Sequence, residues 1–583
     1  MSSPADYHTS PRARPRGVAR RAAAVLSRAP PMADTRNRPE LARMALLSAG
    51  TLLSRVLGML RETLIAATFE AGATDAFFIA WRLPNALRAL LAEGALSAAF
   101  VPMFTATLAR GRAALTEPIK RVGPGPAAGE ATDEHREDLR EVVAYIRGAS
   151  LALLLGLTAL GVVFARPALR VFAGDFGGDT ARFDLSAGLL RVLFPYIFFM
   201  GSAAVGIAAL QTLGRYGALA FAPALLNVAF LIAPFALVPL CVRAGLPPIY
   251  GMALGALLGG ALQLLALVPS LRRERMLPMP RLSLSHPAVR RAAVLLAPSL
   301  VGLGIYQVDV VVSNRFLASM PAGAVSAFSY AQRIADIPQG IFITAVASSF
   351  LPELSRAISN GERERATEKL GDMLGIATFV SVPVAVILAA YGEAVVPLIY
   401  GYGRFQEQGA HGIMEVVRSL RWQAANVALL SLVRQFVAAY HAAQAPRVPV
   451  AVSAVDLAVF IALAVALSGP MGHAGVAAAI AGSTLVQLAL LVAFVHRYVR
   501  VPWGRVLSTL ARVVAAAALT GVAARGLVAV VPWHEATARA RGLAIAGGFA
   551  LGTVYLLAAW LLGIKEIEAV AGKVRSRLRR RRR

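Results

Sequence analysis

The 583-residue sequence contains a single cysteine, Cys241. One cysteine allows neither an intrachain disulfide nor a cluster of thiolates around a metal. The sequence also lacks the motifs GxxxxGK[ST], HExxH, CxxC and GxSxG, and its eight histidines show no ligand spacing. These absences argue against nucleotide hydrolysis, zinc chemistry, thiol redox chemistry and serine hydrolysis. We therefore expect no enzyme activity, no catalytic residue, no cofactor and no dedicated metal site.

Charged residues are also scarce, at 16% of the chain, whereas hydrophobic residues make up 57% and the mean hydropathy is +0.62. This composition is too apolar for an ordinary soluble globular protein. Long apolar runs recur along the whole chain, which is typical of a polytopic membrane protein. Residues 1–42 lack the apolar core and cleavage site of a secretory signal peptide, so we interpret them as a disordered basic arm.

The net charge of +27 would suit a nucleic-acid partner, but the positions of the charges do not. No soluble domain is left to present a basic face, so we predict no nucleic-acid binding. The basic residues gather in the arm, the tail and alternate loops, including 271–291 and 355–369. The positive-inside rule places these segments, and with them both termini, in the cytoplasm.

Hydrophobic segments long enough to cross about 30 Å of hydrocarbon occur about fourteen times. They cover residues 43–68, 74–108, 140–165, 185–213, 219–243, 247–270, 289–317, 322–354, 368–390, 412–442, 447–468, 473–497, 505–529 and 540–563. The second is interrupted near Glu93-Gly94. We predict an all-α polytopic membrane protein with about 14 transmembrane helices.

An internal repeat relates residues 74–111 to residues 325–361. Both copies contain Ala-Phe, then Ala-x-Arg, then two small residues followed by Phe-[Val/Leu]-Pro. Six predicted spans separate the copies, and an even number gives both the same orientation. This is the parallel-repeat arrangement of some transporters, in which the substrate site lies between the halves. We predict two parallel six-helix lobes and an added C-terminal helix pair.

The chain therefore divides into six predicted parts. They are a disordered basic cytoplasmic arm (1–42), an N-lobe (43–270) with a flexible cytoplasmic linker (110–138), a cytoplasmic inter-lobe loop (271–291), a C-lobe (292–497), the added pair (498–563) and a basic cytoplasmic tail (564–583). We expect the tail to contact anionic lipid headgroups.

Several predicted spans carry charges that hydrocarbon tolerates poorly. In SRVLGMLRETLIAATF (54–69), three charges cost roughly 8–10 kcal/mol of insertion free energy, whereas about ten large apolar residues return roughly 5. The intramembrane charges are Arg55, Arg61, Glu62, Asp75, Arg82, Arg88, Glu93, Asp309, Arg333, Asp336, Arg418, Arg421, Arg434 and Asp456. These side chains must face protein, water or each other.

The densest predicted cluster is cationic and lies on the first, second and eighth spans. A guanidinium group stays charged and donates paired hydrogen bonds, which suits phosphate or diphosphate. We hypothesise an anion-binding cavity between the lobes. The alternative is a network of interhelical ion pairs to which Asp75, Glu93 and Asp336 contribute. Glu62 fits a structural counter-charge better than a substrate contact.

Long motifs in this sequence resemble the MurJ (MviN) family of lipid II flippases. They are SRVLGMLRE, TDAFFIAWRLPNALRALLAEGALSAAFVP, AQRIADIPQGIFITAVASSFLPELS, VPLIYGYGRF, AAYHAAQAPRVPVAV and GPMGHAGVAAAIAGS. The resemblance runs from about residue 42 to residue 563. It implies the fold of the multidrug/oligosaccharidyl-lipid/polysaccharide exporter superfamily, with a lipid-tail groove on the added pair.

The resemblance also implies the substrate and the location. Members move lipid II, an undecaprenyl-pyrophosphate-linked disaccharide pentapeptide, from the inner to the outer leaflet of the bacterial cytoplasmic membrane. The implied partners are lipid II, membrane lipids and the cell-wall synthesis machinery. The implied substrate-binding residues are Arg55, Arg61, Arg88 and Arg333. We assign gating or charge-balancing roles to Glu62, Asp75, Asn85, Glu93 and Asp336.

This sequence departs from the family pattern at two points. Gln332 replaces an acid that often precedes the arginine of the eighth span, and Ser313 falls where some members have a sodium-binding carboxylate. Asp309 lies one turn earlier, so Asp309 and Asp456 are weak candidates for a cation site.

Three other functions remain open. A flippase for another polyprenyl-linked glycan, such as an O-antigen unit, would share the lobes, although the helix motifs favour lipid II. A cation-coupled drug exporter should have an acidic, aromatic cavity rather than an arginine-rich one. A non-transporting scaffold for cell-wall enzymes would leave the buried arginines unexplained.

Overall fold

The structure, a computed structural model, describes residues 38–90, 96–115, 132–340, 344–535 and 537–567. Its secondary structure in these ranges is helical. The helices are α2 (Arg38–Thr68), α3 (Ala71–Arg88), α4 (Leu96–Arg110), η3 (Gly111–Leu115), α5 (Asp133–Val163), α6 (Ala165–Ala173), η4 (Phe176–Gly178), α7 (Thr180–Leu193), α8 (Pro195–Thr212), α9 (Gly217–Arg243), α10 (Tyr250–Arg273), α11 (Pro287–Ala318), α12 (Ala324–Pro338), α13 (Thr344–Ser359), α14 (Arg363–Tyr400), α15 (Gly403–Glu407), α16 (Gly409–Ala442), α17 (Arg447–Met471), α18 (His473–Val495), α19 (Trp503–Val530), η6 (Trp533–Glu535) and α20 (Ala538–Leu561). The predicted all-α class is confirmed.

Within the described ranges, 9 helical segments are long and apolar enough to cross a membrane. They are α5, α7 together with α8, α9, α10, α14, α17, α18, α19 and α20. The 34-residue helix α16, which carries Arg418, Arg421 and Arg434, is not among them. The predicted total of about fourteen spans stays a prediction.

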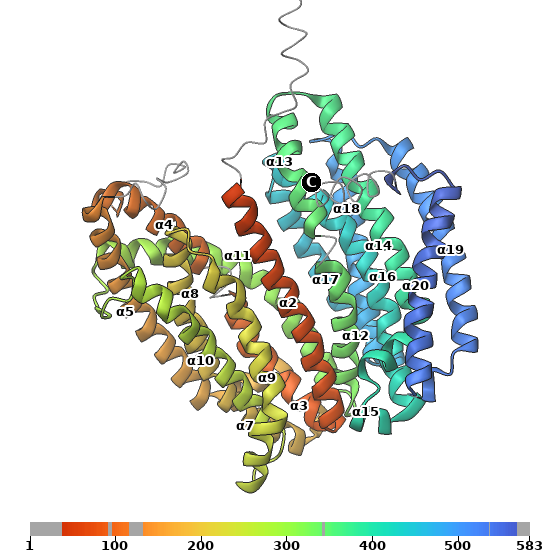
Figure 1. Cartoon of the computed structure of the whole chain (residues 1–583), viewed down its shortest axis with the longest axis horizontal. Helices are drawn as coiled ribbons and strands as arrows, with labels where there is room; N and C mark the ends of the chain where they lie inside the picture. The colour runs from red at the N-terminus through yellow and green to blue at the C-terminus, as the bar shows by residue number, and fades with distance from the viewer. Residues whose placement is uncertain (1–37, 91–95, 116–131, 341–343, 536, 568–583) are drawn as a thin grey trace, which may run out of the picture.

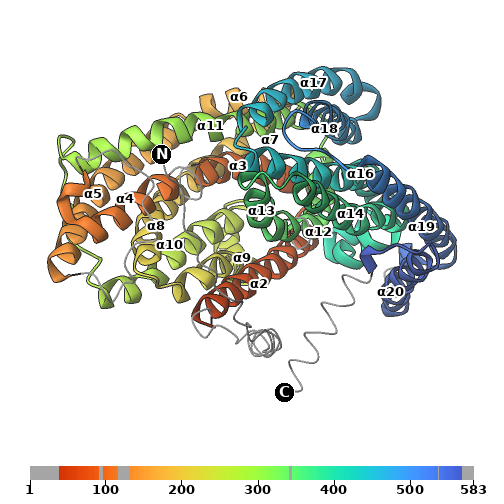
Figure 2. The same cartoon turned by 90° about the horizontal axis from the view of Figure 1, so that it is seen from above.

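The helices form two groups that lie side by side (Figures 1 and 2). The first contains α2 to α10, with α9 packed against α2 and α10. The second contains α12 to α18, with α14 packed against α16 and α17 against α18. Helix α19 packs against α14, so α19 and α20 extend the second group outward. The order follows the two predicted lobes and the added pair, whose boundaries stay predictions.

Helix α11 belongs to both groups. It contacts α4, α5 and α6 of the first group and α17 and α18 of the second. Figure 2 shows α11 running along the first group towards α17. The predicted boundary at residue 292 assigns this helix to the C-lobe alone, whereas its packing makes it a bridge.

The repeat is visible as two pairs of helices, α3 followed by α4 and α12 followed by α13. The first helix of each pair contains a proline, Pro84 in α3 and Pro338 in α12. Proline removes a backbone donor and disturbs the preceding turn of its helix. The predicted interruption at Glu93-Gly94 falls within residues 91–95, outside the described residues.

The flexible linker predicted at 110–138 is shorter in the structure. Helix α5 already begins at Asp133, because the hydroxyl of Thr132 accepts a hydrogen bond from the His135 amide at 3.3 Å. This N-cap and the acids of the first turn stabilise a water-exposed extension that a hydropathy pattern misses. The middle of the linker (116–131), most of the arm (1–37) and most of the tail (568–583) lie outside the described residues.

Candidate functional site

Three neighbouring spaces with shared lining residues lie where the two groups of helices meet. The central cavity has a volume of about 940 Å³, a side pocket lined mainly by the first group about 370 Å³, and a mouth beside the middle of α2 about 470 Å³. Such volumes suit the polar head of a large ligand. Six arginines and four carboxylates line them: Arg55, Arg61, Arg82, Arg88, Arg333, Arg434, Glu62, Asp309, Asp336 and Asp456.

Glu62 holds two of the predicted substrate-binding arginines together. Its Oε1 accepts hydrogen bonds from Arg61 Nη2 at 2.6 Å and from Arg333 Nη2 of α12 at 3.0 Å. Arg61 also donates to Asn227 Oδ1 at 3.2 Å and lies over the Phe230 ring. Two guanidinium groups therefore share one carboxylate, which leaves a net positive charge and free donor capacity beside the cavity.

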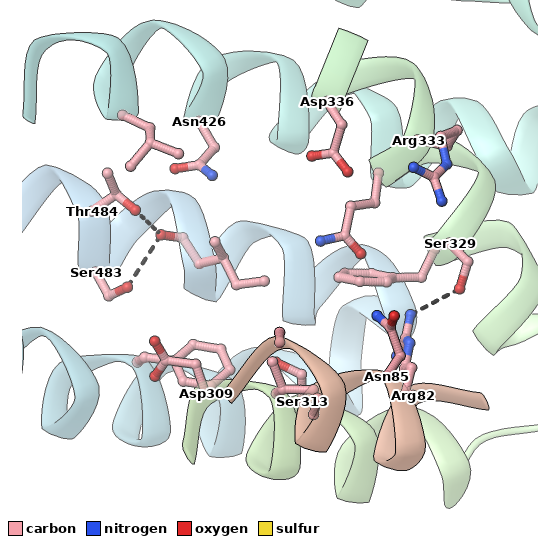
Figure 3. Close-up of a pocket in the computed structure, with 18 of the residues that line it drawn as sticks. Arg82, Asn85, Asp309, Ser313, Ser329, Arg333, Asp336, Asn426, Ser483 and Thr484 are labelled. Atoms are coloured by element: carbon pink, nitrogen blue, oxygen red, sulfur yellow. Dashed lines mark hydrogen bonds between the residues drawn. The ribbon is translucent and has the colours of Figure 1, made fainter. Parts of the chain in front are cut away.

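Arg82 is a cavity arginine that the sequence reasoning placed on a span but not in the site. It donates to Asn314 Oδ1 at 2.6 Å and to Ser329 Oγ at 2.8 Å, so its hydrogen bonds in the described chain go to neutral oxygens. Figure 3 shows Arg82 and Arg333 at the same end of the cavity. The repeat contained the signal, because Arg82 and Arg333 occupy the same place in the Ala-x-Arg motif.

The other two predicted arginines lie around the side pocket. Arg55 lines this pocket and the mouth, and its Nη1 donates to the backbone oxygen of Asp336 at 3.5 Å. Arg88 lines the side pocket, and its Nε donates to Asn85 Oδ1 at 3.1 Å. The four predicted arginines thus surround neighbouring spaces rather than one point. Glu93 lies outside the described residues.

Asp75 joins the two lobes at the end of the cavity away from the mouth. It is fully buried, and its carboxylate accepts hydrogen bonds from the amides of Gly323 and Ser326, both at 2.7 Å, and from the Ser326 hydroxyl. These groups form the N-terminus of α12, which favours a negative charge. Gly323 has φ +98°, a conformation that other residues rarely adopt.

Arg182 completes this seam, and the sequence reasoning did not single it out. Its Nη1 lies 3.5 Å from Asp75 Oδ2, and its Nη2 donates to the backbone oxygens of Ala318 and Met320 at the end of α11. The seam therefore ties α3 and α7 to α11 and α12.

Two further carboxylates lie at the end of the central cavity opposite Arg82 and Arg333. Asp309 of α11 and Asp456 of α17 both line it, and in the described chain the Oδ1 atom of each is buried without a hydrogen-bond partner. Figure 3 shows Asp309 near Ser483 and far from the arginines. The described residues contain no group of three His, Cys, Asp or Glu side chains that could hold a metal. Any cation held here would need neutral oxygens as further ligands.

Comparison with known families decides the family. The family described as "Lipid II flippase MurJ" matches residues 65–538. The chain belongs to this family. Multiple apolar helices and MurJ membership make it an integral protein of the inner membrane.

Individual MurJ relatives match across most of their length. The "Probable lipid II flippase MurJ" of Vibrio cholerae is 28% identical over 89% of this chain and 95% of its own. The "Lipid II flippase MurJ" of Burkholderia cenocepacia is 29% identical over 78% and 84%. The probable flippase of Bdellovibrio bacteriovorus is 28% identical over 78% and 81%.

Solved structures support the MurJ fold. The "inward closed conformation" of the lipid II flippase MurJ matches with a TM-score of 0.69 and 20% identity, over 89% of this chain and 98% of the other. An inward-facing multidrug resistance MATE transporter of the MOP superfamily matches with a TM-score of 0.57 and 16% identity, over 78% and 95%. At these identities the matches show the fold alone.

Proposed function

We propose that this protein is a lipid II flippase that carries the polar head of an undecaprenyl-pyrophosphate-linked disaccharide pentapeptide across the inner membrane. The observation that carries the proposal is the cluster of arginines in cavities between two repeat-related lobes, in a chain of the MurJ family. A flippase changes no covalent bond of its cargo, in keeping with the absence of catalytic motifs.

The diphosphate is the part of lipid II that these arginines suit. Arg61 and Arg333 already lie on either side of Glu62, and Arg82 lines the same cavity with only neutral hydrogen-bond partners in the described chain. A diphosphate entering between them gains charge-assisted hydrogen bonds. The central cavity, about 940 Å³ with polar groups at both ends, receives the sugars and peptide.

Transport follows from alternating access, in which the lobes rock about the bound head. The Asp75 seam closes one end while the mouth, lined by Arg55 and Arg434, remains at the other. By the positive-inside rule the mouth faces the cytoplasm and both termini are cytoplasmic. The membrane potential, negative inside, then drives the diphosphate outward with about 2.3 kcal/mol per charge per 100 mV.

The lipid tail remains in the membrane during this cycle. We assign its path to the surface of α19 and α20, which extend the second lobe and expose large apolar side chains such as Leu519, Val522 and Phe549. Enzymes of cell-wall synthesis that make or consume lipid II are proposed partners.

Two alternative functions are less well supported. A flippase for an O-antigen-type lipid would need the same diphosphate contacts, but the family match names lipid II. A drug exporter is suggested by the match to the MATE transporter structure. At 16% identity this match supports a shared fold but says nothing about the substrate.

Complementation tests the proposal directly. In a strain depleted of its own lipid II flippase, the wild-type chain should restore growth, whereas Arg55→Ala, Arg88→Ala and Arg333→Ala should not. Each loses charge-assisted contacts worth about 1.5–3 kcal/mol. Arg243→Ala, an exposed arginine at the end of α9, serves as the control.

Two outcomes would overturn parts of this proposal. Equal rescue by all three cavity variants would remove the anion-cavity mechanism. A correctly inserted wild-type chain that fails to rescue, but restores growth or surface glycan in an O-antigen flippase mutant, would move the substrate to another polyprenyl-linked glycan.

A further inference from the structure

A second arginine cluster lies outside the transport cavity, where α14, α16 and α19 meet. Glu393 Oε1 of α14 accepts hydrogen bonds from Arg421 Nη2 of α16 at 2.9 Å and from Arg525 Nη1 of α19 at 2.7 Å. A single oxygen therefore holds two guanidinium groups side by side. Neither arginine lines any of the three spaces described above.

The cluster has a net positive charge and open donors. The Glu393 side chain is only 10% exposed, whereas those of Arg421 and Arg525 are 42% and 53% exposed. Each guanidinium has five N–H donors, and in the described chain one nitrogen of each donates to Glu393. Arg525 Nη1 additionally approaches the Ala390 oxygen at 3.5 Å.

The position of the cluster along the membrane normal favours a lipid headgroup. Helix α19 has 28 residues and is about 42 Å long at 1.5 Å per residue, so it exceeds a hydrocarbon core of about 30 Å. Arg525 lies five residues from its end, which is about the level of the headgroups. Trp422, beside Arg421, is 41% exposed, and tryptophan is enriched at this level.

A surplus arginine at this depth needs an anion or water, because hydrocarbon cannot compensate its charge. Two guanidinium groups held together by one shared carboxylate match the oxygens of a phosphate, which accept paired hydrogen bonds. The cluster also lies where α19 packs against the second lobe, and α19 is one of the helices to which we assign the lipid tail.

We propose that Arg421 and Arg525 form a clamp for the phosphate group of a membrane lipid, at the end of α19 away from the mouth. In the proposed orientation this is the outer leaflet. The ligand chemistry is a phosphate or diphosphate ester on a lipid tail, either a phospholipid or the polyprenyl diphosphate that leaves the cavity. The clamp goes beyond the proposed function, since it would bind phosphate whether or not the central cavity transports lipid II.

Native mass spectrometry of the full chain in neutral detergent tests the clamp. The probes are phosphatidylglycerol, undecaprenyl diphosphate and, as a phosphate-free lipid with matched acyl chains, monoglucosyldiacylglycerol. Arg421→Gln and Arg525→Gln should each weaken phosphate-lipid binding about tenfold, and the double variant should abolish it. Binding of the glycolipid should not change. Arg170→Gln, on an exposed pair with Asp175 in the first lobe, is the matched control.

Glu393→Gln separates a ligand clamp from a structural clip. The clamp predicts that Glu393→Gln retains or strengthens phosphate-lipid binding, because the two arginines lose their resident counter-charge. If Glu393→Gln loses as much binding as the double arginine variant, or if that double variant binds like the wild type, the clamp is refuted. Thermal unfolding of every variant monitors folding.

The two lipid sources are distinguished in an Arg333→Ala background, which disables the central site. In that background, the double Arg421→Gln and Arg525→Gln substitution is added. If it removes binding of phosphatidylglycerol alone, the ligand of the clamp is a phospholipid. If it removes binding of undecaprenyl diphosphate alone, the ligand is the exported carrier. Arg333→Ala should itself remove one bound undecaprenyl diphosphate that the wild type retains. If it does not, the proposed central site fails, whereas the clamp is still tested by the binding of phosphatidylglycerol.

Discussion

Helices α3 and α12 are two copies of one motif, and they use its arginine differently. In α12, Arg333 pairs with Glu62 at 3.0 Å. In α3, the equivalent Arg82 reaches only the neutral oxygens of Asn314 and Ser329 in the described chain. The difference arises outside the repeated motif, because the carboxylate comes from α2.

This contrast shows how a symmetric scaffold acquires an asymmetric site. One arginine has a hydrogen-bonded carboxylate partner, whereas the hydrogen bonds of the other, in the described chain, go to neutral oxygens. The copies also touch directly, since Asp75 of the first accepts hydrogen bonds from Ser326, its equivalent in the second. Four experiments would break or sharpen the comparison, in order of decreasing effect.

The largest effect is expected from Asp75→Ala. It removes the acceptor that holds the N-terminus of α12 and one of the two carboxylates beside buried Arg182, which keeps Asp179 at 3.3 Å. Each charge-assisted hydrogen bond lost costs about 1.5–3 kcal/mol. We expect the seam to open. Spin labels are attached at Asp175→Cys and Gln406→Cys, on the two sides of the seam, in a Cys241→Ser background. The distance between the labels, measured by pulsed electron paramagnetic resonance, should increase in Asp75→Ala.

Ser326→Ala is the milder control for that experiment, because the two backbone amides still bind Asp75. In Ser326→Ala, a smaller fraction of molecules than in Asp75→Ala should show the longer distance between the spin labels. An unchanged distance distribution in Asp75→Ala would mean that the seam does not hold the lobes.

The second experiment compares the two repeat-related arginines. Arg82→Met and Arg333→Met should each weaken binding of farnesyl diphosphate about tenfold, as measured by calorimetry. Only Arg333→Met removes a partner from a buried carboxylate, so only this variant should lower the unfolding temperature markedly. Equal unfolding temperatures would contradict the difference we describe.

The third experiment removes the asymmetry itself. Glu62→Gln deletes the negative charge that Arg61 and Arg333 share while keeping a hydrogen-bond acceptor. Affinity for farnesyl diphosphate should rise severalfold, because the ligand no longer competes with a resident carboxylate. Glu70→Gln, at an exposed acid that precedes α3, is the control, and weaker binding in Glu62→Gln would oppose our interpretation.

The smallest effect on stability is expected at Asp309 and Asp456, at the end of the central cavity opposite Arg82 and Arg333. Asp309 and Asp456 line the same cavity, and in the described chain each has a buried carboxylate oxygen without a hydrogen-bond partner, so a bound cation should stabilise the wild type. Sodium chloride should raise its unfolding temperature more than choline chloride does, and Asp309→Asn should lose this difference of about 1 kcal/mol or less. Sodium sensitivity that persists in Asp309→Asn would place the cation elsewhere.

Much of the architecture could be predicted from the sequence because membranes constrain it strongly. Apolar runs identify the spans, and the repeat predicts that α3 and α12 are equivalent. The α5 extension was missed because a capped, polar helix end has no hydropathy signal.

The site was predicted less completely, for a physical reason. Arginine side chains could be assigned to spans, but their partners come from other helices. Asn227 of α9 and Arg182 of α7 contact Arg61 and Asp75 across large sequence separations. Arg82 could have been found from its repeat partner Arg333, whereas Arg182 carries no such signal.

The Asp75 seam has a consequence for the populations of the two states. Moving a two-state equilibrium from 99:1 to 1:99 takes about 5.5 kcal/mol. Two or three charge-assisted hydrogen bonds, at about 1.5–3 kcal/mol each, supply that amount. In the proposed alternating-access cycle, one carboxylate at the contact between the two repeats is therefore enough to set which leaflet the empty protein faces. A cargo reverses this preference only by binding the opposite state more tightly by the same amount.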